Sequence, residues 1–120
     1  MSIILIADDN PQNLYLVRFL LEKNSHEVDE VVNGEQAVQA AQDKEYDLIL
    51  MDIQMPVLDG LGATRMIKLM ANAPIIVALT AKAMAGDAEH ILASGCDGYI
   101  SKPIDAREFM GQIDGFLKNE

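Results

Sequence analysis

Carboxylates follow two short apolar runs in this sequence. Asp52 comes directly after Leu48–Met51, and Asp8 with Asp9 comes directly after Ser2–Ala7. Each run is too short for a helix and is typical of a strand that is buried on both faces of a parallel sheet. Because open α/β sheets gather their chemistry beyond the carboxyl ends of their strands, these three acids are candidate site residues.

Two more polar side chains end apolar segments farther along the chain. Thr80 is the last residue of Ile75–Thr80, and Lys102 follows the short segment Gly98–Ser101. If all of these strands are parallel, their carboxyl ends meet at one edge of the sheet. We therefore expect the Thr80 hydroxyl and the Lys102 amine to lie beside the three carboxylates.

This set of side chains suits a divalent cation and a phosphoryl group. Carboxylates held close together repel one another, and a hard cation such as Mg²⁺, which prefers oxygen ligands, relieves that repulsion. With the Lys102 ammonium and a dication, the site would come close to neutral. Aspartate can also act as a nucleophile that forms an acyl phosphate, so one of these aspartates could accept a phosphoryl group whose oxygens face Mg²⁺, Lys102 and Thr80.

The segments between these strands have the apolar spacing of helices. Apolar residues recur at intervals of three and four, which places them on one face of a helix. Asn10 before Pro11 predicts a helix start, and Gly95 predicts a helix end. The five expected helices are marked by Leu14, Val17 and Leu21; Ala37, Val38 and Ala41; Ala63, Met66, Ile67 and Met70; Ala88, Ile91 and Leu92 within Ala81–Ser94; and Phe109, Ile113, Phe116 and Leu117 after Asp105.

A weaker strand is expected at His26–Val32, where Glu27, Asp29 and Glu30 interrupt the valines. Charged strands belong at the edge of a sheet. With this strand included, the chain reads strand then helix five times over. Right-handed crossovers between parallel strands then predict an α/β fold with a doubly wound, three-layer architecture. No linker divides the sequence, so residues 1–120 are expected to form one domain.

The composition narrows the possible partners. The chain has 120 residues and a formal net charge of −10, which disfavours binding to nucleic acid or to an anionic membrane, because their phosphates would be repelled. No apolar run approaches the ~20 residues of a membrane-spanning helix, and no signal segment opens the sequence. Cys96 is the single cysteine, so no intramolecular disulfide can form, and a reducing cytoplasm is the expected setting.

The chain closely resembles the receiver domain of two-component response regulators, and the resemblance covers its whole length. It rests on an ordered set of motifs, which are Asp8-Asp9, Met51–Pro56 with Asp59-Gly60, Thr80-Ala81 and Lys102-Pro103. The sequence is similar above all to stand-alone receivers of bacterial cell-cycle control and to receivers of hybrid histidine kinases. The resemblance implies a flavodoxin-like sheet of five parallel strands in the order 2-1-3-4-5, flanked by five helices.

The resemblance also implies a phosphoacceptor and a metal site. Asp52 would accept the phosphoryl group. Mg²⁺ would be held by Asp8, Asp9, Asp52 and the backbone carbonyl of Gln54, with Asp9 as a direct ligand and Asp8 acting through water.

A switch is implied in the same way. Thr80 would bond the phosphoryl group and Lys102 would pair with it, while Tyr99 stands where the family carries its switch aromatic. The Lys102–Pro103 peptide bond would be cis. Movement of Thr80 toward the phosphoryl group would let Tyr99 turn inward and would change the surface formed by the fourth helix, the fifth strand and the fifth helix.

The function implied by the resemblance is a phosphorylation-controlled signalling switch. Such a domain accepts a phosphoryl group from a histidine kinase or a histidine phosphotransfer protein, and it catalyses only its own phosphoryl transfer and slow dephosphorylation. It would signal through protein contacts, and no DNA-binding output domain is expected in this chain. Two roles stay open, which are allosteric regulation of a partner and a phosphorelay shuttle to another histidine.

Two alternative functions, of which a flavin-binding module shares this topology, need different residues at the strand ends. A flavin-binding module needs a phosphate cradle after the first strand, and the sequence Asp8-Asp9-Asn10-Pro11 found there repels phosphate. An aspartate-nucleophile phosphohydrolase needs a second acid two residues after the nucleophile, where this chain has Gln54. Because a fold does not fix a function, the strand-end residues decide between these alternatives.

Overall fold

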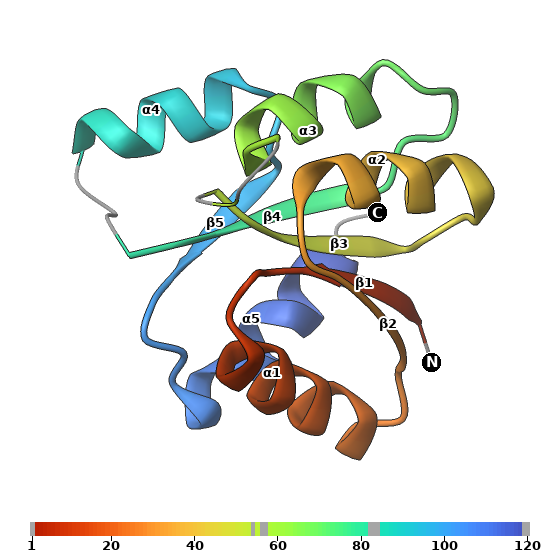
Figure 1. Cartoon of the computed structure of the whole chain (residues 1–120). Helices are drawn as coiled ribbons and strands as arrows, with labels where there is room; N and C mark the ends of the chain where they lie inside the picture. The colour runs from red at the N-terminus through yellow and green to blue at the C-terminus, as the bar shows by residue number, and fades with distance from the viewer. Residues whose placement is uncertain (1, 54, 56–57, 82–84, 119–120) are drawn as a thin grey trace.

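Strands and helices alternate along the chain, and Figure 1 shows them as a central sheet with helices on both sides. The computed structural model describes residues 2–53, 55, 58–81 and 85–118. The strands are β1 (Ile3–Ala7), β2 (Glu27–Val31), β3 (Leu48–Asp52), β4 (Ile75–Thr80) and β5 (Gly98–Ser101). The helices are α1 (Pro11–Lys23), α2 (Gly34–Asp43), α3 (Gly60–Lys68), α4 (Ala85–Ala93) and α5 (Ala106–Lys118). None of these described helices is long and apolar enough to cross a membrane.

All strand pairs of the sheet are parallel, and the strand order is β2-β1-β3-β4-β5. This order confirms the doubly wound α/β fold that was predicted. β1, β3 and β4 lie inside the sheet and bury nearly all of their side chains, which explains their continuous apolar sequences. β2 lies at an edge, where its charged residues were predicted to belong.

Two hydrophobic cores lie on opposite faces of the sheet, because successive side chains of a strand point to opposite sides. In Figure 1, α1 and α5 cover one face, and α2, α3 and α4 cover the other. Strand residues of the core under α1 and α5 include Ile4, Ile6, Leu48, Leu50, Val77, Leu79 and Ile100. Strand residues of the opposite core include Leu5, Ala7, Ile49, Met51, Ile76 and Ala78.

Charged side chains of the edge strand β2 form ion pairs and hydrogen bonds with residues that precede β3. Lys44 places its Nζ 2.9 Å from a carboxylate oxygen of Glu27 and 2.9 Å from one of Asp29. The Tyr46 hydroxyl donates a 2.7 Å hydrogen bond to the same Asp29 oxygen. The hydrogen bond from Lys44 lowers the pKa of the Asp29 carboxyl, whereas burial and the bond to Asp29 raise the pKa of Tyr46 to about 12.

Caps fix where several helices begin or end. Asn10, Asn33 and Asp59 occupy the N-caps of α1, α2 and α3, and the side chain of each accepts a hydrogen bond from a backbone amide of the first turn. Gly95 has a φ of +108° just after α4, a conformation that residues with side chains rarely adopt. The predicted helix start at Asn10 and the predicted stop at Gly95 are therefore confirmed.

Two predicted core positions on the helices are wrong. Met66 was expected on the inner face of α3 but is 49% exposed, and Leu92 was expected on the inner face of α4 but is 51% exposed. The apolar spacing allowed both Met66 and Ile67 to face inward. In the structure Ile67 is buried and Met66 is not. The fourth helix was expected at Ala81–Ser94, and the structure shows a helix, α4, at Ala85–Ala93 within that range. Residues 82–84 lie outside the described part of the chain.

Candidate functional site

Three carboxylates lie together at the carboxyl edge of the sheet. Asp52 is the last residue of β3, and Asp8 and Asp9 directly follow β1. One oxygen from each of these side chains lies within 4.8 Å of one from both others. Asp8 is fully buried and Asp52 is 5% exposed, whereas Asp9 is open to solvent. The structure thus brings together the acids that the sequence placed at neighbouring strand ends.

The alternation of side chains along each strand explains this convergence. Asp8, Asp52 and Lys102 each come two positions after a residue of the core under α1 and α5. Those core residues are Ile6, Leu50 and Ile100. Because side chains two apart on a strand share a face, all three site residues continue the row that faces α1 and α5. Thr80 instead continues the row of Ala78, which belongs to the opposite core.

Lys102 joins the two buried acids. Its Nζ lies 3.2 Å from Asp52 Oδ2 and 3.3 Å from Asp8 Oδ2, and the lysine side chain is 18% exposed. The Lys102 backbone amide donates a 2.7 Å hydrogen bond to the Thr80 carbonyl, so the backbone also holds this residue beside β4. The Lys102–Pro103 peptide bond is cis, as the resemblance implied.

The charges of the described site residues do not balance. Among the residues that the structure describes, three carboxylates face one ammonium group, an excess of two negative charges when all are ionised. Asp8 Oδ1 accepts a 2.9 Å hydrogen bond from the Asn10 amide, but the buried Asp8 Oδ2 accepts none from the described residues, and Lys102 reaches it only as an ion pair. An unsatisfied carboxylate oxygen beside two other carboxylates is a donor set that a hard divalent cation favours, so these residues fit Mg²⁺.

A hollow of about 290 Å³ opens beside Asp52. It is lined by residues from the ends of four strands, which are Asp9, Asn10, Asp52, Ile53, Ala81 and Lys102. The space can admit a phosphoryl group within reach of Asp52 and Lys102. The sequence indicated Asn10 only as a helix cap, and its position directly after two acids is the signal that could have added it to the site.

Thr80 and Tyr99 lie on the same face of the sheet. Thr80 is 1% exposed at the end of β4, and Tyr99 is 36% exposed in β5. The register pairs Tyr99 with Ala78 and Thr80 with Ser101, so the two proposed switch residues stand diagonally on neighbouring strands. Gln54, whose backbone carbonyl was expected to bind Mg²⁺, lies outside the described residues.

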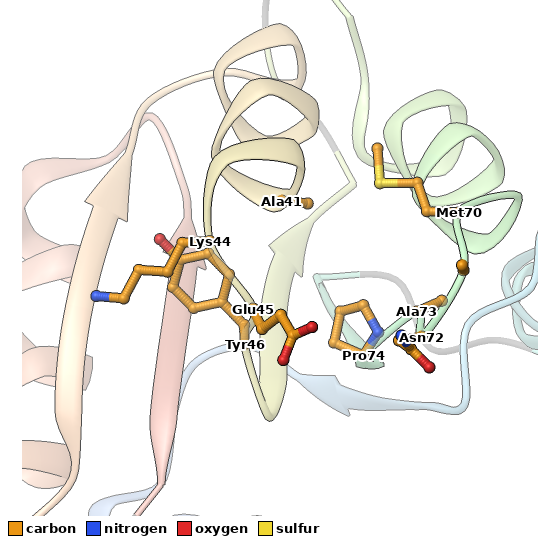
Figure 2. Close-up of a pocket in the computed structure, with 9 residues that line it drawn as sticks. Ala41, Lys44, Glu45, Tyr46, Met70, Asn72, Ala73 and Pro74 are labelled. Carbon is orange, nitrogen blue, oxygen red and sulfur yellow. The ribbon is translucent and has the colours of Figure 1, made fainter.

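A second hollow lies at the opposite, amino end of the strands, between the end of α2 and the segment after α3 (Figure 2). Tyr46 and Pro74, just before β3 and β4, contribute to its walls, as does Met70. Lys44 stands at its rim, but the amine points away toward β2, where it pairs with two carboxylates. Among the residues that the structure describes, the one cluster of acids suited to a metal ion is at the other edge.

The sequence matches a known family over most of its length. A family model described as the response regulator receiver domain matches residues 4–114. The chain is a response regulator receiver domain.

Related receiver domains occur in proteins of very different length. The sensor protein GacS of Pseudomonas syringae pv. syringae is 47% identical over an alignment of 111 residues, and the match covers 88% of this chain but only 12% of GacS. The polar-differentiation response regulator DivK of Brucella anthropi is 41% identical over an alignment of 117 residues, and the match covers 95% of this chain and 94% of that protein. The chain therefore matches a short receiver almost completely and spans a small part of a sensor protein.

A solved receiver domain has the same fold. The receiver domain of the sensor histidine kinase PA1611 from Pseudomonas aeruginosa is 38% identical, covers 98% of both chains and superposes with a TM-score of 0.90. In that crystal structure a magnesium ion is coordinated in the active site cleft.

Proposed function

We propose that this receiver domain accepts a phosphoryl group on Asp52 and transmits the change through protein contacts. The observation that carries the proposal is the setting of Asp52. Its carboxylate is nearly buried at the end of the central strand β3, borders the hollow, and has the Lys102 amine at 3.2 Å. A nucleophile, a cation and space for the transferred group are thus combined at one strand end.

The reaction transfers a phosphoryl group from a phosphohistidine of a histidine kinase or of a histidine phosphotransfer protein. A carboxylate oxygen of Asp52 forms a bond to phosphorus while the bond from phosphorus to the imidazole nitrogen breaks, and the imidazole leaves. Beyond the nucleophile, the protein contributes mainly position and charge. The domain is therefore a signalling protein that catalyses its own modification and the slow loss of the group.

Lys102 and Thr80 stabilise the transferred group from two sides. The Lys102 amine, already beside Asp52, pairs with a phosphoryl oxygen, and this pairing favours the charge that the reaction brings into the site. Thr80 is buried at the end of the neighbouring strand β4 and offers its hydroxyl to another phosphoryl oxygen.

Mg²⁺ is assigned to the cluster of Asp8, Asp9 and Asp52, with the backbone carbonyl of Gln54 as a further ligand. When bound, the metal offsets the negative charge of the acids and of the incoming group. Exposed Asp9 is assigned as a direct ligand, and buried Asp8 acts through water. The unsatisfied Asp8 Oδ2 and the magnesium-bound receiver domain of PA1611 support this assignment.

The output surface is assigned to α4, β5 and α5. Tyr99 of β5 supports the assignment, because it is 36% exposed and lies with Thr80 on the sheet face that α4 helps to cover. The similarity to GacS and DivK supports a place in a two-component or phosphorelay pathway. Residues 1–120 would act as one receiver unit in the cytoplasm, a setting that the free, buried thiol of Cys96 suits. Neither nucleic acid nor membrane is a partner, in keeping with the net charge of −10.

Mass spectrometry after incubation with a small phosphodonor and Mg²⁺ tests the proposal. Wild-type protein should gain one phosphoryl mass, and Asp52→Asn should gain none. Asp43→Asn is the matched control, because Asp43 is an exposed acid at the end of α2, and this variant should label like wild type. Equal labelling of wild type and Asp52→Asn would show that Asp52 is not the acceptor.

A further inference from the structure

The first turn of α3 lies directly against the backbone of Asp52. Gly60 is buried at the start of this helix, and its amide donates a 3.3 Å hydrogen bond to the Ile53 carbonyl. A Cβ atom at Gly60 would overlap the Asp52 carbonyl oxygen and would lie 2.8 Å from the Ile53 Cα. These neighbours are backbone atoms, which cannot rotate away as a flexible side chain can. Glycine therefore permits an approach that no other residue could make without moving the chain.

The other side of this backbone is held by β4. Asp52 is in register with Leu79, and the Ile53 amide donates a 3.3 Å hydrogen bond to the Leu79 carbonyl. The chain at Asp52 and Ile53 is thus confined between β4 and Gly60. A side chain at position 60 would have to displace either α3 or the backbone that carries the Asp52 carboxylate.

Gly34, the first residue of α2, contacts the residues that lead into α3. Its amide donates a 3.0 Å hydrogen bond to the Leu58 carbonyl. A Cβ atom at Gly34 would overlap that carbonyl oxygen and would lie 3.1 Å from the carbonyl oxygen of Asp59, the N-cap of α3. Gly34 therefore fixes where α3 begins, and Gly60 fixes how closely that beginning rests on Asp52.

From these contacts we infer that Gly60, supported by Gly34, is a positioning residue for Asp52. The close approach of α3 sets the place of the Asp52 carboxylate relative to Lys102 and to the other two acids. The inference rests on the proposed function, because its consequence is the affinity of this site for Mg²⁺ and for a phosphoryl group.

The test compares Gly60→Ala with Gly62→Ala in the same turn of α3. A Cβ atom at Gly62 would come nearest, at 2.9 Å, to Leu58 Cδ1, which is the end of a flexible side chain. Both variants gain the same residue in the same turn, so their helix propensities change similarly, and the comparison isolates the contact with Asp52. Amide chemical shifts are titrated with Mg²⁺, and then with beryllofluoride as a phosphoryl mimic, while melting temperatures are recorded separately.

We expect Gly60→Ala to bind Mg²⁺ about ten- to a hundredfold more weakly than wild type, as when the support of a metal ligand is disturbed. Gly62→Ala should bind like wild type. A folded Gly60→Ala that melts at a lower temperature but keeps wild-type affinity for both probes would overturn the inference and leave the proposed function intact. If wild type takes up neither probe, the inference and the proposed function fail together.

Gly34→Ala extends the test to the case in which Gly60→Ala does not fold. The added Cβ atom would meet the backbone of Leu58 rather than that of Asp52. We expect this variant to bind both Mg²⁺ and beryllofluoride more weakly than wild type. Unchanged affinity for Mg²⁺ and beryllofluoride in folded Gly34→Ala would equally overturn the inference.

Discussion

The amine of Lys102 lies 3.3 Å from Oδ2 of Asp8, a carboxylate that is fully buried. No hydrogen bond within the described residues reaches that oxygen, so among these residues the ion pair with Lys102 compensates its charge. The same amine stands 3.2 Å from Asp52. Removing one partner of a buried ion pair leaves a charge uncompensated where solvent cannot screen it, which costs more than the pair contributes.

Lys102→Met should therefore lower the free energy of unfolding by about 3 kcal/mol in buffer without Mg²⁺. The value is at the lower end of the usual range because the lysine side chain is 18% exposed. Methionine keeps most of the chain length and removes the ammonium group with its charge. Adding Mg²⁺ should restore part of the loss, because a dication replaces the missing positive charge. Urea unfolding at neutral pH, with and without Mg²⁺, measures both effects.

Lys68→Met is the matched control for this experiment. Lys68 pairs with Asp97 at 2.7 Å, but their side chains are 25% and 41% exposed, and the pair lies away from the acidic cluster. Its loss should cost about 1 kcal/mol or less and should not depend on Mg²⁺. Equal, Mg²⁺-independent losses in the two variants would contradict the compensating role of Lys102.

Asp9→Ala should remove most of the stabilisation by Mg²⁺. A ligand that binds only the folded state adds roughly 2.7 kcal/mol at a hundredfold excess over its Kd. Wild type should melt at a clearly higher temperature in Mg²⁺, and Asp9→Ala should respond much less. Without Mg²⁺ the variant should be at least as stable as wild type, because one repelling carboxylate is gone. Asp114→Ala, an exposed position on α5, is the control. An identical Mg²⁺ response in Asp9→Ala would argue against Asp9 as a ligand.

The inner strands could be predicted from the sequence because burial on both faces leaves a continuous apolar run. The inner strand Ile75–Thr80 has the same bounds in the sequence prediction and in the structure, and so does Gly98–Ser101, although β5 lies at an edge of the sheet. The convergence of Asp8 and Asp52 follows from the same reasoning, since parallel strands share one carboxyl edge. The strand order was implied only by the family resemblance, because no local pattern states which strands pair.

Features that depend on tertiary packing could not be predicted from the sequence. Met66 has the right spacing for the inner face of α3, yet the helix is rotated so that Ala63 and Ile67 are buried and Met66 is half-exposed. The contact between Gly60 and Asp52 has the same origin. It depends on how the chain after β3 returns to the strand end, and the dipeptide Asp59-Gly60 indicates only that a turn is present.

Tyr46→Phe should change the response of the protein to high pH. Burial and the hydrogen bond to Asp29 raise the pKa of Tyr46 to about 12, compared with roughly 10 in an unfolded chain. Between these values the folded state binds more protons than the unfolded state, so the free energy of unfolding falls as pH rises through this window. Tyr46→Phe should lack this loss.

Ultraviolet absorbance of the phenolate measures the effect directly. Subtracting the Tyr46→Phe titration from that of wild type should leave one transition with a midpoint of about 12. Tyr15→Phe, at an exposed position on α1, should retain that transition. A difference transition close to the ordinary tyrosine value would mean that Tyr46 is neither buried nor hydrogen-bonded to Asp29 in solution as the structure shows.

Thr80→Ala should separate phosphoryl acceptance from signalling. Thr80 and Tyr99 share one face of the sheet on neighbouring strands, and Tyr99 is 36% exposed. A phosphoryl group on Asp52 would draw the Thr80 hydroxyl toward it and vacate space that the Tyr99 ring can enter. The change is a shift between two existing arrangements, and the group biases it only through its preference for one of them. Without the hydroxyl, Asp52 should still be modified, but the bias toward the inward arrangement of Tyr99 should be lost.

Amide chemical shifts of α4 and β5, recorded with and without beryllofluoride, test this route. Wild type should show large changes there, Thr80→Ala much smaller ones, and both should show changes at Asp52, which proves that the mimic is bound. Thr80→Ser keeps the hydroxyl at the same position and should respond like wild type, so it distinguishes loss of the hydrogen bond from loss of the methyl group. If the mimic moves the amides of α4 and β5 equally in wild type and Thr80→Ala, the signal does not leave the site through Thr80 and Tyr99.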